Sequence, residues 1–365
     1  MQMMIKPEKT NITIGFSPLT DCAPFVVAKN LGYFAQWGLD VTLQKQNSWA
    51  TLRDKLHAGI LDAAQMLAPM PIASTLGLGV APMHVIAPMI LSQNGNGITL
   101  SESLVEEILA VNQISELVFP LDAKLLKNVI EKRKQHGSDK LCFASVFPFS
   151  CHHYQLQDWL LSGNITFEDV NIIVVPPSNM VDSMLSGDID GFCVGGPWNA
   201  KAVRGGSGVT VITSYDIWQD YPEKVLGFLS SFATSHPKTV LAICAALKQA
   251  CTWLDSTPNR FETAVIMSRE GILGEPLEVI APSLLGSCLT KKGLSPRHVP
   301  SYNQFSTTLG GLDINRPDIK HGFWLLEKIK NCQQISADVE TDGVIESIFR
   351  SDIYAQLALL IDKKG

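Results

Sequence analysis

Residues 12–16 read Ile-Thr-Ile-Gly-Phe, an alternation of apolar and small or polar residues that predicts a β-strand. Asp21 can cap the helix that follows, and Leu39–Leu43 predicts a second strand. A helix over Ser48–His57 and a short buried strand over Leu61–Leu67 complete the stretch. The resulting order is β, α, β, α, β, which is typical of a doubly wound α/β unit.

The same alternation returns after a charged, helix-like stretch from Glu102 to Lys140. It predicts strands over Leu141–Val146, Ile172–Val175 and Ile189–Val194, and helices over Cys151–Leu161 and Asn179–Leu185. Residues 56–64 and 184–192 repeat one pattern, namely a helix end, a glycine, an apolar residue, an aspartate and a small residue. We therefore expect two doubly wound lobes, each carrying one copy of this pattern.

The last third of the chain is mainly helical. Helices are predicted over Lys238–Leu254, Arg260–Arg269, Pro276–Leu285, Phe323–Ile329 and Val344–Leu360. We expect them to pack back on the first lobe. The predicted boundaries are then 12–97 and 214–365 for lobe 1 and 98–213 for lobe 2, with a central cleft. A chain of 365 residues with 46% hydrophobic residues is long enough for two separate cores.

Composition excludes several partner classes. The chain has 29 basic and 35 acidic residues, a net charge of −6, and no block of one sign, so we expect no direct contact with nucleic acid or with an anionic membrane. Residues 63–101 contain no charged residue, but prolines and glycines interrupt that run too often for one membrane-spanning helix.

Two further features bear on the cellular compartment. Residues 1–11 lack the apolar stretch of a secretory signal and a lipid-anchored cysteine, so we expect a cytoplasmic protein. The eight cysteines lie mostly in apolar runs without a C-x-x-C pair, which favours buried, reduced thiols.

Five motifs in one order carry a family resemblance. They are 15–24 (GFSPLTDCAP), 48–55 (SWATLRDK), 66–71 (MLAPMP), 94–100 (NGNGITL) and 190–199 (DGFCVGGPWN). Together they resemble the nitrate- and bicarbonate-binding proteins of the NrtA/CmpA family, over about residues 12–268. The resemblance implies a type II periplasmic-binding-protein fold, with two lobes and a cleft that closes on a small anion.

The same resemblance implies four anion contacts. They are a Trp in the S-W-A segment, an amide in the N-G-N segment, a His after a strand that ends in Phe-Pro, and a Lys after Pro-Glu. In this chain these residues are Trp49, Asn96, His152 and Lys224. Nitrate-transporting members tend to carry Gln where Asn96 stands, and Asn reaches one methylene less far, which affects affinity and selectivity.

The chemistry of nitrate fits that set. Nitrate carries one charge and offers only acceptors, so its site requires one cation and neutral donors, with no carboxylate facing it. Bicarbonate-binding relatives place a carboxylate at the position of Lys224 to hold a metal ion, so the lysine argues against bicarbonate and calcium. We expect no metal, cofactor or catalytic residue. We assign Asp21 a structural role as a helix N-cap.

Each predicted contact has a plainer interpretation. Lys224 alone reads as a solvated lysine in the first turn of a helix, and Trp49 alone reads equally well as a core aromatic residue. Cys151, His152 and His153 resemble metal ligands, but neighbouring side chains on a helix point about 100° apart and share one metal poorly.

Within the family, transport members carry an export signal and a lipid anchor that the NasS-type sensors lack, so the missing signal predicts the sensor branch. We predict a nitrate or nitrite sensor that closes on the anion and releases an RNA-binding antiterminator of the NasT type, thereby regulating nitrate assimilation genes. The alternatives are the substrate-binding component of a nitrate ABC transporter or, as a more distant rival, a small-molecule enzyme on the same fold. The sequence shows neither a nucleophile and base at recognisable spacing nor a phosphate-binding loop, so it gives the enzyme hypothesis no support.

Overall fold

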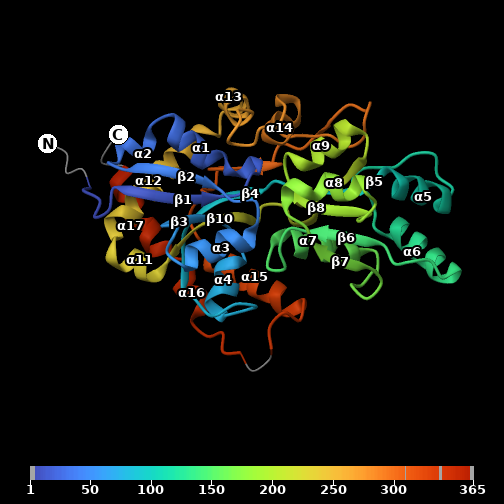
Figure 1. The fold of residues 1–365 in the computed structure, drawn as a ribbon, viewed down its shortest axis with the longest axis horizontal. Coiled ribbons are helices and arrows are strands. Elements are labelled where there is room, and N and C mark those ends of the chain that lie inside the picture. Colours follow the sequence, from blue (N-terminus) through green and yellow to red (C-terminus); the bar gives the residue numbers. More distant parts are fainter. Residues whose placement is uncertain (1–4, 309, 337–338, 362–365) are drawn as a thin grey trace. The chain divides into compact units, whose positions relative to one another are not determined.

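The computed structural model describes residues 5–308, 310–336 and 339–361, and the chain divides into two compact units (Figure 1). Unit 1 comprises Met1–Gln93, Tyr221–Gly274 and Gln304–Gly365. Unit 2 comprises Asn94–Asp220 and Glu275–Asn303. Each unit is built on its own β-sheet, as the two repeats of the α/β pattern predict.

Unit 1 is built on a six-stranded sheet in the order β13-β4-β10-β3-β1-β2. The strands are β1 (Asn11–Phe16), β2 (Asp40–Lys45), β3 (Ala63–Leu67), β4 (Val85–Asn94), β10 (Pro222–Leu229) and β13 (Asn303–Gln304). Strand β1 pairs in parallel with β2 and β3, whereas β10 runs antiparallel to β3 and β4. The late strand β10 therefore lies inside the first sheet, although the whole of unit 2 except Glu275–Asn303 precedes it in sequence.

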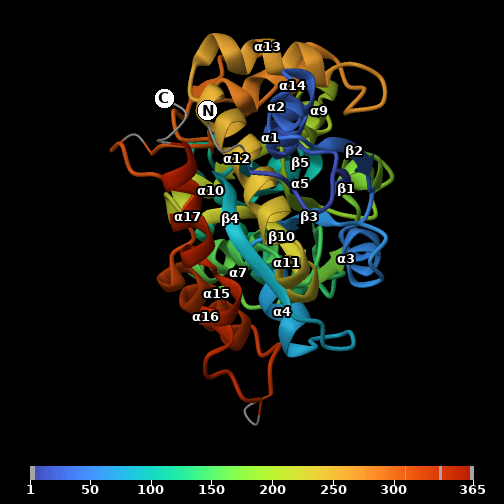
Figure 2. The same cartoon turned by 90° about the vertical axis from the view of Figure 1, so that its left-hand side faces the viewer.

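Helices cover the sheet of unit 1. They are η1 (Thr20–Cys22), α1 (Ala23–Asn30), α2 (Tyr33–Gln36), α3 (Trp49–His57), α4 (Met70–Leu76), α11 (Ser230–Ser235), α12 (Pro237–Trp253), α13 (Thr257–Met267), α15 (Ile319–Asn331), α16 (Val344–Ile348) and α17 (Ser351–Ile361). The long helix α12 contacts α1, α2 and α17 (Figure 2), and the buried side chains on it are mostly apolar. Packing of apolar surface on α12 thus joins the N-terminal and C-terminal helices of this unit.

Unit 2 is built on a five-stranded sheet in the order β7-β6-β8-β5-β9. Its strands are β5 (Asn96–Ser101), β6 (Cys142–Ser145), β7 (Asn171–Val174), β8 (Gly191–Gly195) and β9 (Gly208–Thr213), with a separate pair β11 (Ser287–Cys288) and β12 (Arg297–His298). Its helices are α5 (Glu102–Asn112), α6 (Lys124–His136), α7 (Cys151–Ser162), η2 (Pro177–Asn179), α8 (Met180–Leu185), α9 (Trp198–Gly205), α10 (Ser214–Trp218) and α14 (Leu277–Leu284). Leu104, Leu126, Phe143 and Trp159 belong to one buried core between these helices and the sheet.

The two units differ from the predicted lobes, which we placed at 12–97 with 214–365 and at 98–213. Residues 275–303 belong to unit 2, so the prediction that all late helices pack on the first lobe is corrected for this segment. The reason is specific contact: α14 packs on α9, and Arg297 donates to Asp216 at 2.8 Å. The short stretches 94–97 and 214–220 also fall in unit 2.

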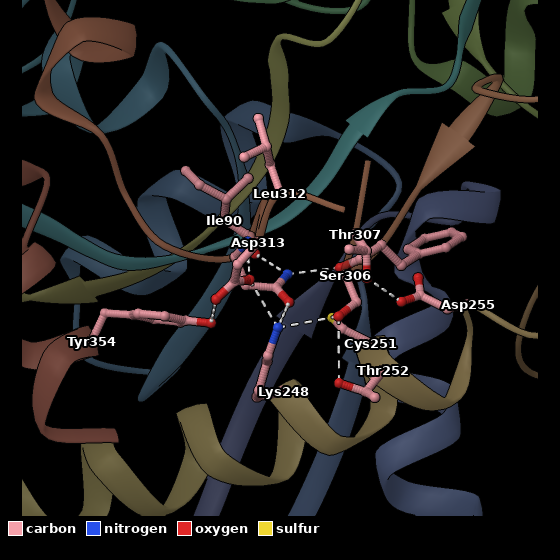
Figure 3. Close-up of polar contacts among 12 residues, drawn as sticks. Ile90, Lys248, Cys251, Thr252, Asp255, Ser306, Thr307, Leu312, Asp313 and Tyr354 are labelled. Carbon is pink, nitrogen blue, oxygen red and sulfur yellow. Dashed lines mark hydrogen bonds and ion pairs between the residues drawn. The ribbon is translucent and has the colours of Figure 1, made fainter. Parts of the chain in front are cut away.

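A network of polar contacts attaches the segment after residue 303 to α12 in unit 1 (Figure 3). Lys248 Nζ donates to Asp313 Oδ1 at 2.8 Å, Asn315 Oδ1 at 2.9 Å and Ser306 Oγ at 3.1 Å. The hydroxyl of Tyr354 on α17 donates to the other oxygen of Asp313 at 2.8 Å. Lys248 and Asp313 together join α12, the stretch 306–315 and α17 within unit 1.

Two further predictions of helices and strands can be compared with the structure. The uncharged run at 63–101 forms β3, α4, β4 and β5, so it is not one long helix, and it contains one strand more than we predicted from the interrupting prolines and glycines. Among the described residues no helix combines the length and the apolarity needed to span a membrane. The single helix predicted over Val344–Leu360 is instead two helices, because the chain leaves the helical conformation at Phe349.

Candidate functional site

Two of the predicted contacts, Trp49 and Lys224, meet in unit 1. Trp49 is the first residue of α3, whose N-cap Ser48 accepts the backbone N–H of Thr51 at 3.4 Å. Lys224 lies on β10, and its Nζ is 5.6 Å from the centroid of the Trp49 ring. Both side chains are buried, with 1% and 0% of their surface exposed. The plainer interpretation of Lys224 as a solvated helical lysine is therefore wrong.

Lys224 is held by two carboxylates. Its Nζ lies 2.9 Å from Asp21 Oδ2 and 2.8 Å from Glu223 Oε1, and both acidic side chains are at least 98% buried. The pairing of β10 with β4 shifts register on both sides of Lys224, a β-bulge or similar irregularity of the ladder. Bulges re-aim side chains, and here neighbours that would alternate across a regular strand contact each other.

The charges decide the protonation state of this lysine. Burial alone would lower the pKa of Lys224, but the adjacent charges of Asp21 and Glu223 outweigh that effect and raise the pKa above its ordinary value. Lys224 is thus a cation at any physiological pH. One ammonium meets two carboxylates here, so the cluster has a net formal charge of −1, which the sequence did not predict.

Asp21 has a different role from the predicted N-cap. It lies within η1, and no side-chain cap bond forms at the start of η1 or of α1. Instead Asp21 Oδ1 accepts from Gln65 Nε2 at 2.6 Å, while Gln65 Oε1 accepts the backbone N–H of Ser17 at 3.0 Å. This chain of contacts orients the carboxylate toward Lys224.

Sequence reasoning missed Ser17, Gln65 and Glu223 as members of this cluster. Ser17 follows the last residue of β1, and Gln65 lies on β3, so they gather near the carboxyl ends of two parallel strands. Open α/β sheets bind ligands at that edge. The positions of Ser17 and Gln65 relative to the predicted strands were therefore a signal that could have identified them. Glu223 carried a weaker signal, because it stood next to a predicted contact.

Two buried polar atoms near Lys224 are left without a hydrogen-bond partner. Neither Trp49 Nε1 nor Ser17 Oγ has a hydrogen-bond partner among the described residues, although both atoms are buried. Buried polar atoms without a partner are rare and costly in folded proteins, and a ligand that accepts hydrogen bonds would satisfy these two. The arrangement suits a ligand that only accepts hydrogen bonds and that lies next to a cation.

Asn96 and His152, the other two predicted contacts, lie in unit 2. Asn96 opens β5, and His152 lies in the first turn of α7; both are fully buried. Asn96 Nδ2 donates to Gln155 Oε1 at 2.9 Å, and Gln155 sits one helical turn after His152. Gln155, which sequence reasoning missed, therefore links Asn96 to the helix that carries His152.

The amide of Asn96 is committed in this arrangement. Its donor group is used by Gln155, and its Oδ1 has no hydrogen-bond partner among the described residues. Amide oxygen and nitrogen are assigned from the hydrogen-bond network, so a joint flip of both amides would keep the bond and free the Asn96 donor. Cys193 Sγ, 3.8 Å from Gln155 Oε1, opposes that flip by donating to the same oxygen.

Metal chemistry has no cluster to support it in the described part of the chain, where no group of three or more His, Cys, Asp or Glu side chains is placed to hold an ion. His153 packs edge-on against Phe167, with ring centroids 5.0 Å apart. Burial lowers the pKa of His153 to about 4, so it is neutral near pH 7.

Comparisons with known proteins agree with this fold. The NMT1-like family matches residues 5–268 of the chain. The nitrate import ATP-binding protein NrtC of Synechocystis is 34% identical over 96% of this chain and 50% of its own length. The nitrate/nitrite binding protein NrtA of Synechococcus elongatus is 31% identical over 98% of this chain and 80% of its own length.

A solved structure is also similar. The crystal structure of the periplasmic nitrate-binding protein NrtA from Synechocystis has a TM-score of 0.88 and 28% identity, over 98% of this chain and 91% of that one. This likeness confirms the predicted type II periplasmic-binding-protein fold. The chain spans about half the length of the first curated relatives it matches, the ATP-binding proteins of transport systems.

Proposed function

The chain belongs to the NMT1-like family and, within it, to the NrtA/CmpA-like nitrate-binding proteins, and from this premise we propose that it binds nitrate or nitrite and is not an enzyme. The anion accepts hydrogen bonds from the Trp49 indole and from Lys224 in unit 1. Asn96 and His152 of unit 2 remain predicted contacts of the anion.

One observation carries this proposal: the buried Trp49 indole, whose N–H has no partner among the described residues, has the buried ammonium of Lys224 5.6 Å from its ring centroid. An ammonium has three N–H donors, and Asp21 and Glu223 use two of those on Lys224. The third is left for the ligand. An anion that only accepts hydrogen bonds suits both donors.

Calorimetric titration with nitrate, nitrite, bicarbonate and sulfate tests this function. We expect nitrate and nitrite to bind without added metal, and bicarbonate and sulfate to bind far more weakly. A second negative charge on sulfate raises the cost of burial beside the two carboxylates. Tighter, calcium-dependent binding of bicarbonate would overturn the proposal.

Trp49→Phe sharpens the test, because it keeps an aromatic ring and removes only the indole N–H. Hydrogen bonds to charged groups contribute about 1.5 to 3 kcal/mol, so nitrate should bind roughly tenfold to a hundredfold more weakly. Trp37→Phe is the matched control in the same unit, where the indole donates to Gln249 at 2.9 Å instead. Equal nitrate affinity in both variants would remove Trp49 from the site.

For the cellular role we propose a cytoplasmic sensor that binds an antiterminator of the NasT type and releases it when the anion binds. The resemblance of the motifs to the nitrate-binding family supports binding of the anion, which such a sensor requires. A net charge of −6 without a basic stripe leaves nucleic-acid binding to the partner. Binding linkage requires nitrate and the antiterminator to weaken each other by the same factor, with couplings of about 1 to 3 kcal/mol.

A transport-associated role is the second candidate, and the 34% identity to half of a nitrate import ATP-binding protein favours it. A pull-down of the cognate antiterminator with and without saturating nitrate separates the two roles. Binding that nitrate abolishes supports the sensor. A complex that nitrate leaves unchanged, or no complex at all, supports the transport-associated role.

A further inference from the structure

A cavity of about 140 Å³ opens within unit 2, and none of its lining comes from unit 1. Val203 and Arg204 at the end of α9 line it, together with residues of the segment 289–294 between β11 and β12. Cavities that enclose a small organic molecule usually measure about 300 to 1,000 Å³. The size of this cavity therefore suits a side chain of another protein.

The cavity is basic, and two of its cations are free. Arg204 and Lys292 are exposed and form no ion pair among the described residues, whereas Lys291 lies 3.5 Å from Glu102. Leu294, which also lines the cavity, is 57% exposed. An acidic side chain next to an apolar one would complement this combination of free cations and exposed apolar surface.

A patch of the opposite charge lies on α8 of the same unit. Asp182 and Leu185 are three residues apart and therefore share one side of the helix, and Asp188 follows in the turn after it. All three side chains are exposed, that of Leu185 by 67%. Asp188 accepts a hydrogen bond from the hydroxyl of Ser186 at 2.6 Å, but neither aspartate forms an ion pair among the described residues. We call Asp182, Leu185 and Asp188 the acidic patch.

The short segment 206–208 lies between the cavity and the acidic patch. Lys292 Nζ is 3.4 Å from the place that a Cβ on Gly206 would take. Met184 Sδ on α8 is 3.1 Å from the corresponding place at Gly208. Helices α8 and α9 also contact each other directly (Figure 1). The basic cavity and the acidic patch are therefore neighbours on one face of unit 2.

We propose that this face binds the same face of a second copy of the chain, with the acidic patch of each copy on the basic cavity of the other. A surface that carries both signs side by side matches itself after a twofold rotation, which is the commonest symmetry of protein dimers. Leu185 of one copy then meets Leu294 of the other. The leucines supply apolar contact, and the charges determine orientation and partner.

The overall charge of the chain makes these local pairs necessary. Two copies with a net charge of −6 repel each other at long range, so their association depends on opposite charges in contact. A nucleic acid matches the face less well, because exposed aspartates lie beside the three cations and no aromatic side chain lines the cavity for base stacking. The proposed dimer requires no bound anion and is independent of the function proposed above.

Sedimentation velocity of the full chain tests the dimer by reversing charges. Arg204→Glu with Lys292→Glu makes both halves of the face acidic, and Asp182→Lys with Asp188→Lys makes both basic. Each double variant alone should dimerise at least roughly a hundredfold more weakly than wild type, because like charges then meet at two places. An equimolar mixture of the two variants should restore the dimer, because every contact again pairs opposite signs.

A double variant of unit 1 is the matched control. Arg269→Glu with Lys320→Glu changes two exposed cations and the net charge by the same amount, and it should leave association unchanged. Circular dichroism checks that each variant is folded, which the exposure of the replaced side chains favours.

Three results would overturn the proposal. The first is a wild-type protein that stays monomeric at about 100 μM in low salt. The second is a dimer that both charge-reversed variants retain, which would place the interface elsewhere. The third is a mixture of the two variants that fails to associate although each is folded. A monomer that binds RNA or an acidic peptide through Arg204 and Lys292 would give the cavity to that partner instead.

Discussion

Replacing Lys224 with methionine should destabilise the protein strongly, quite apart from any ligand. Methionine has a similar length and no charge, so the change leaves Asp21 and Glu223 buried without their cation. Removing one partner of a buried ion pair costs about 3 to 5 kcal/mol, because the charge left behind has lost its compensation. Typical folded proteins are stable by only about 5 to 15 kcal/mol, so the loss is a large share.

The burial of all three side chains sets that magnitude. Exposed fractions of 0% for Lys224, 2% for Asp21 and 1% for Glu223 allow no screening by solvent. The control is Lys9→Met, which breaks a 2.6 Å pair with Asp62 in the same unit. Lys9 is 43% exposed, and such surface pairs contribute about 0 to 1 kcal/mol.

Urea unfolding followed by tryptophan fluorescence gives the free energies of unfolding. The deficit of Lys224→Met should be larger at about pH 8 than at about pH 5, because burial without a cation disfavours the charged form of a carboxylate and lower pH favours the neutral form. The triple variant with Asp21→Asn and Glu223→Gln should recover most of the loss. A deficit below about 1 kcal/mol, or one that is independent of pH, would refute the buried charge cluster.

Three other predictions concern separate parts of the chain. A folded Lys224→Ala protein should bind nitrate roughly tenfold to a hundredfold more weakly than wild type, and an unchanged affinity would remove Lys224 from the site. His153 has a folded pKa of about 4 against an ordinary value of 6.5, so the unfolded chain binds the proton more readily. The contribution of His153 to the free energy of unfolding should therefore be complete above about pH 6.5 and should fall toward pH 4. His153→Gln should lack this slope when the free energy of unfolding is measured by urea titration at each pH. Lys248→Met should lower the free energy of unfolding by about 1 to 3 kcal/mol and open the chain near Asp313 to proteolysis, and resistance equal to wild type would show that the network is dispensable.

The fold was predictable because local patterns determine it. The repeated helix, glycine and aspartate pattern at 56–64 and 184–192 corresponds to the junctions α3 to β3 and α8 to β8. Alternating apolar residues and turn-forming glycines mark such elements without any knowledge of the partner strands. The predicted boundaries failed at 275–303, because membership of that segment depends on contacts with α9 and Asp216 that no local pattern encodes.

The site was predictable only in part. Family resemblance singled out Trp49 and Lys224, and the structure brings them together. The resemblance could not give the surroundings of Lys224, since Asp21 is distant in sequence and the register shifts in β10 beside Lys224 have no local sequence signal. Asp21 looked like a helix cap because an aspartate before a helix usually is one. Its actual partners, Gln65 and Lys224, come from two other strands.

The central claim is that a small anion accepts hydrogen bonds from Trp49 and Lys224, and a crystal structure of the protein grown with saturating nitrate tests it most directly. We predict planar density within hydrogen-bonding distance of Trp49 Nε1 and Lys224 Nζ, with Asp21 and Glu223 still on the lysine. Nitrate bound elsewhere, or an indole N–H still without a partner at saturating nitrate, would contradict the claim.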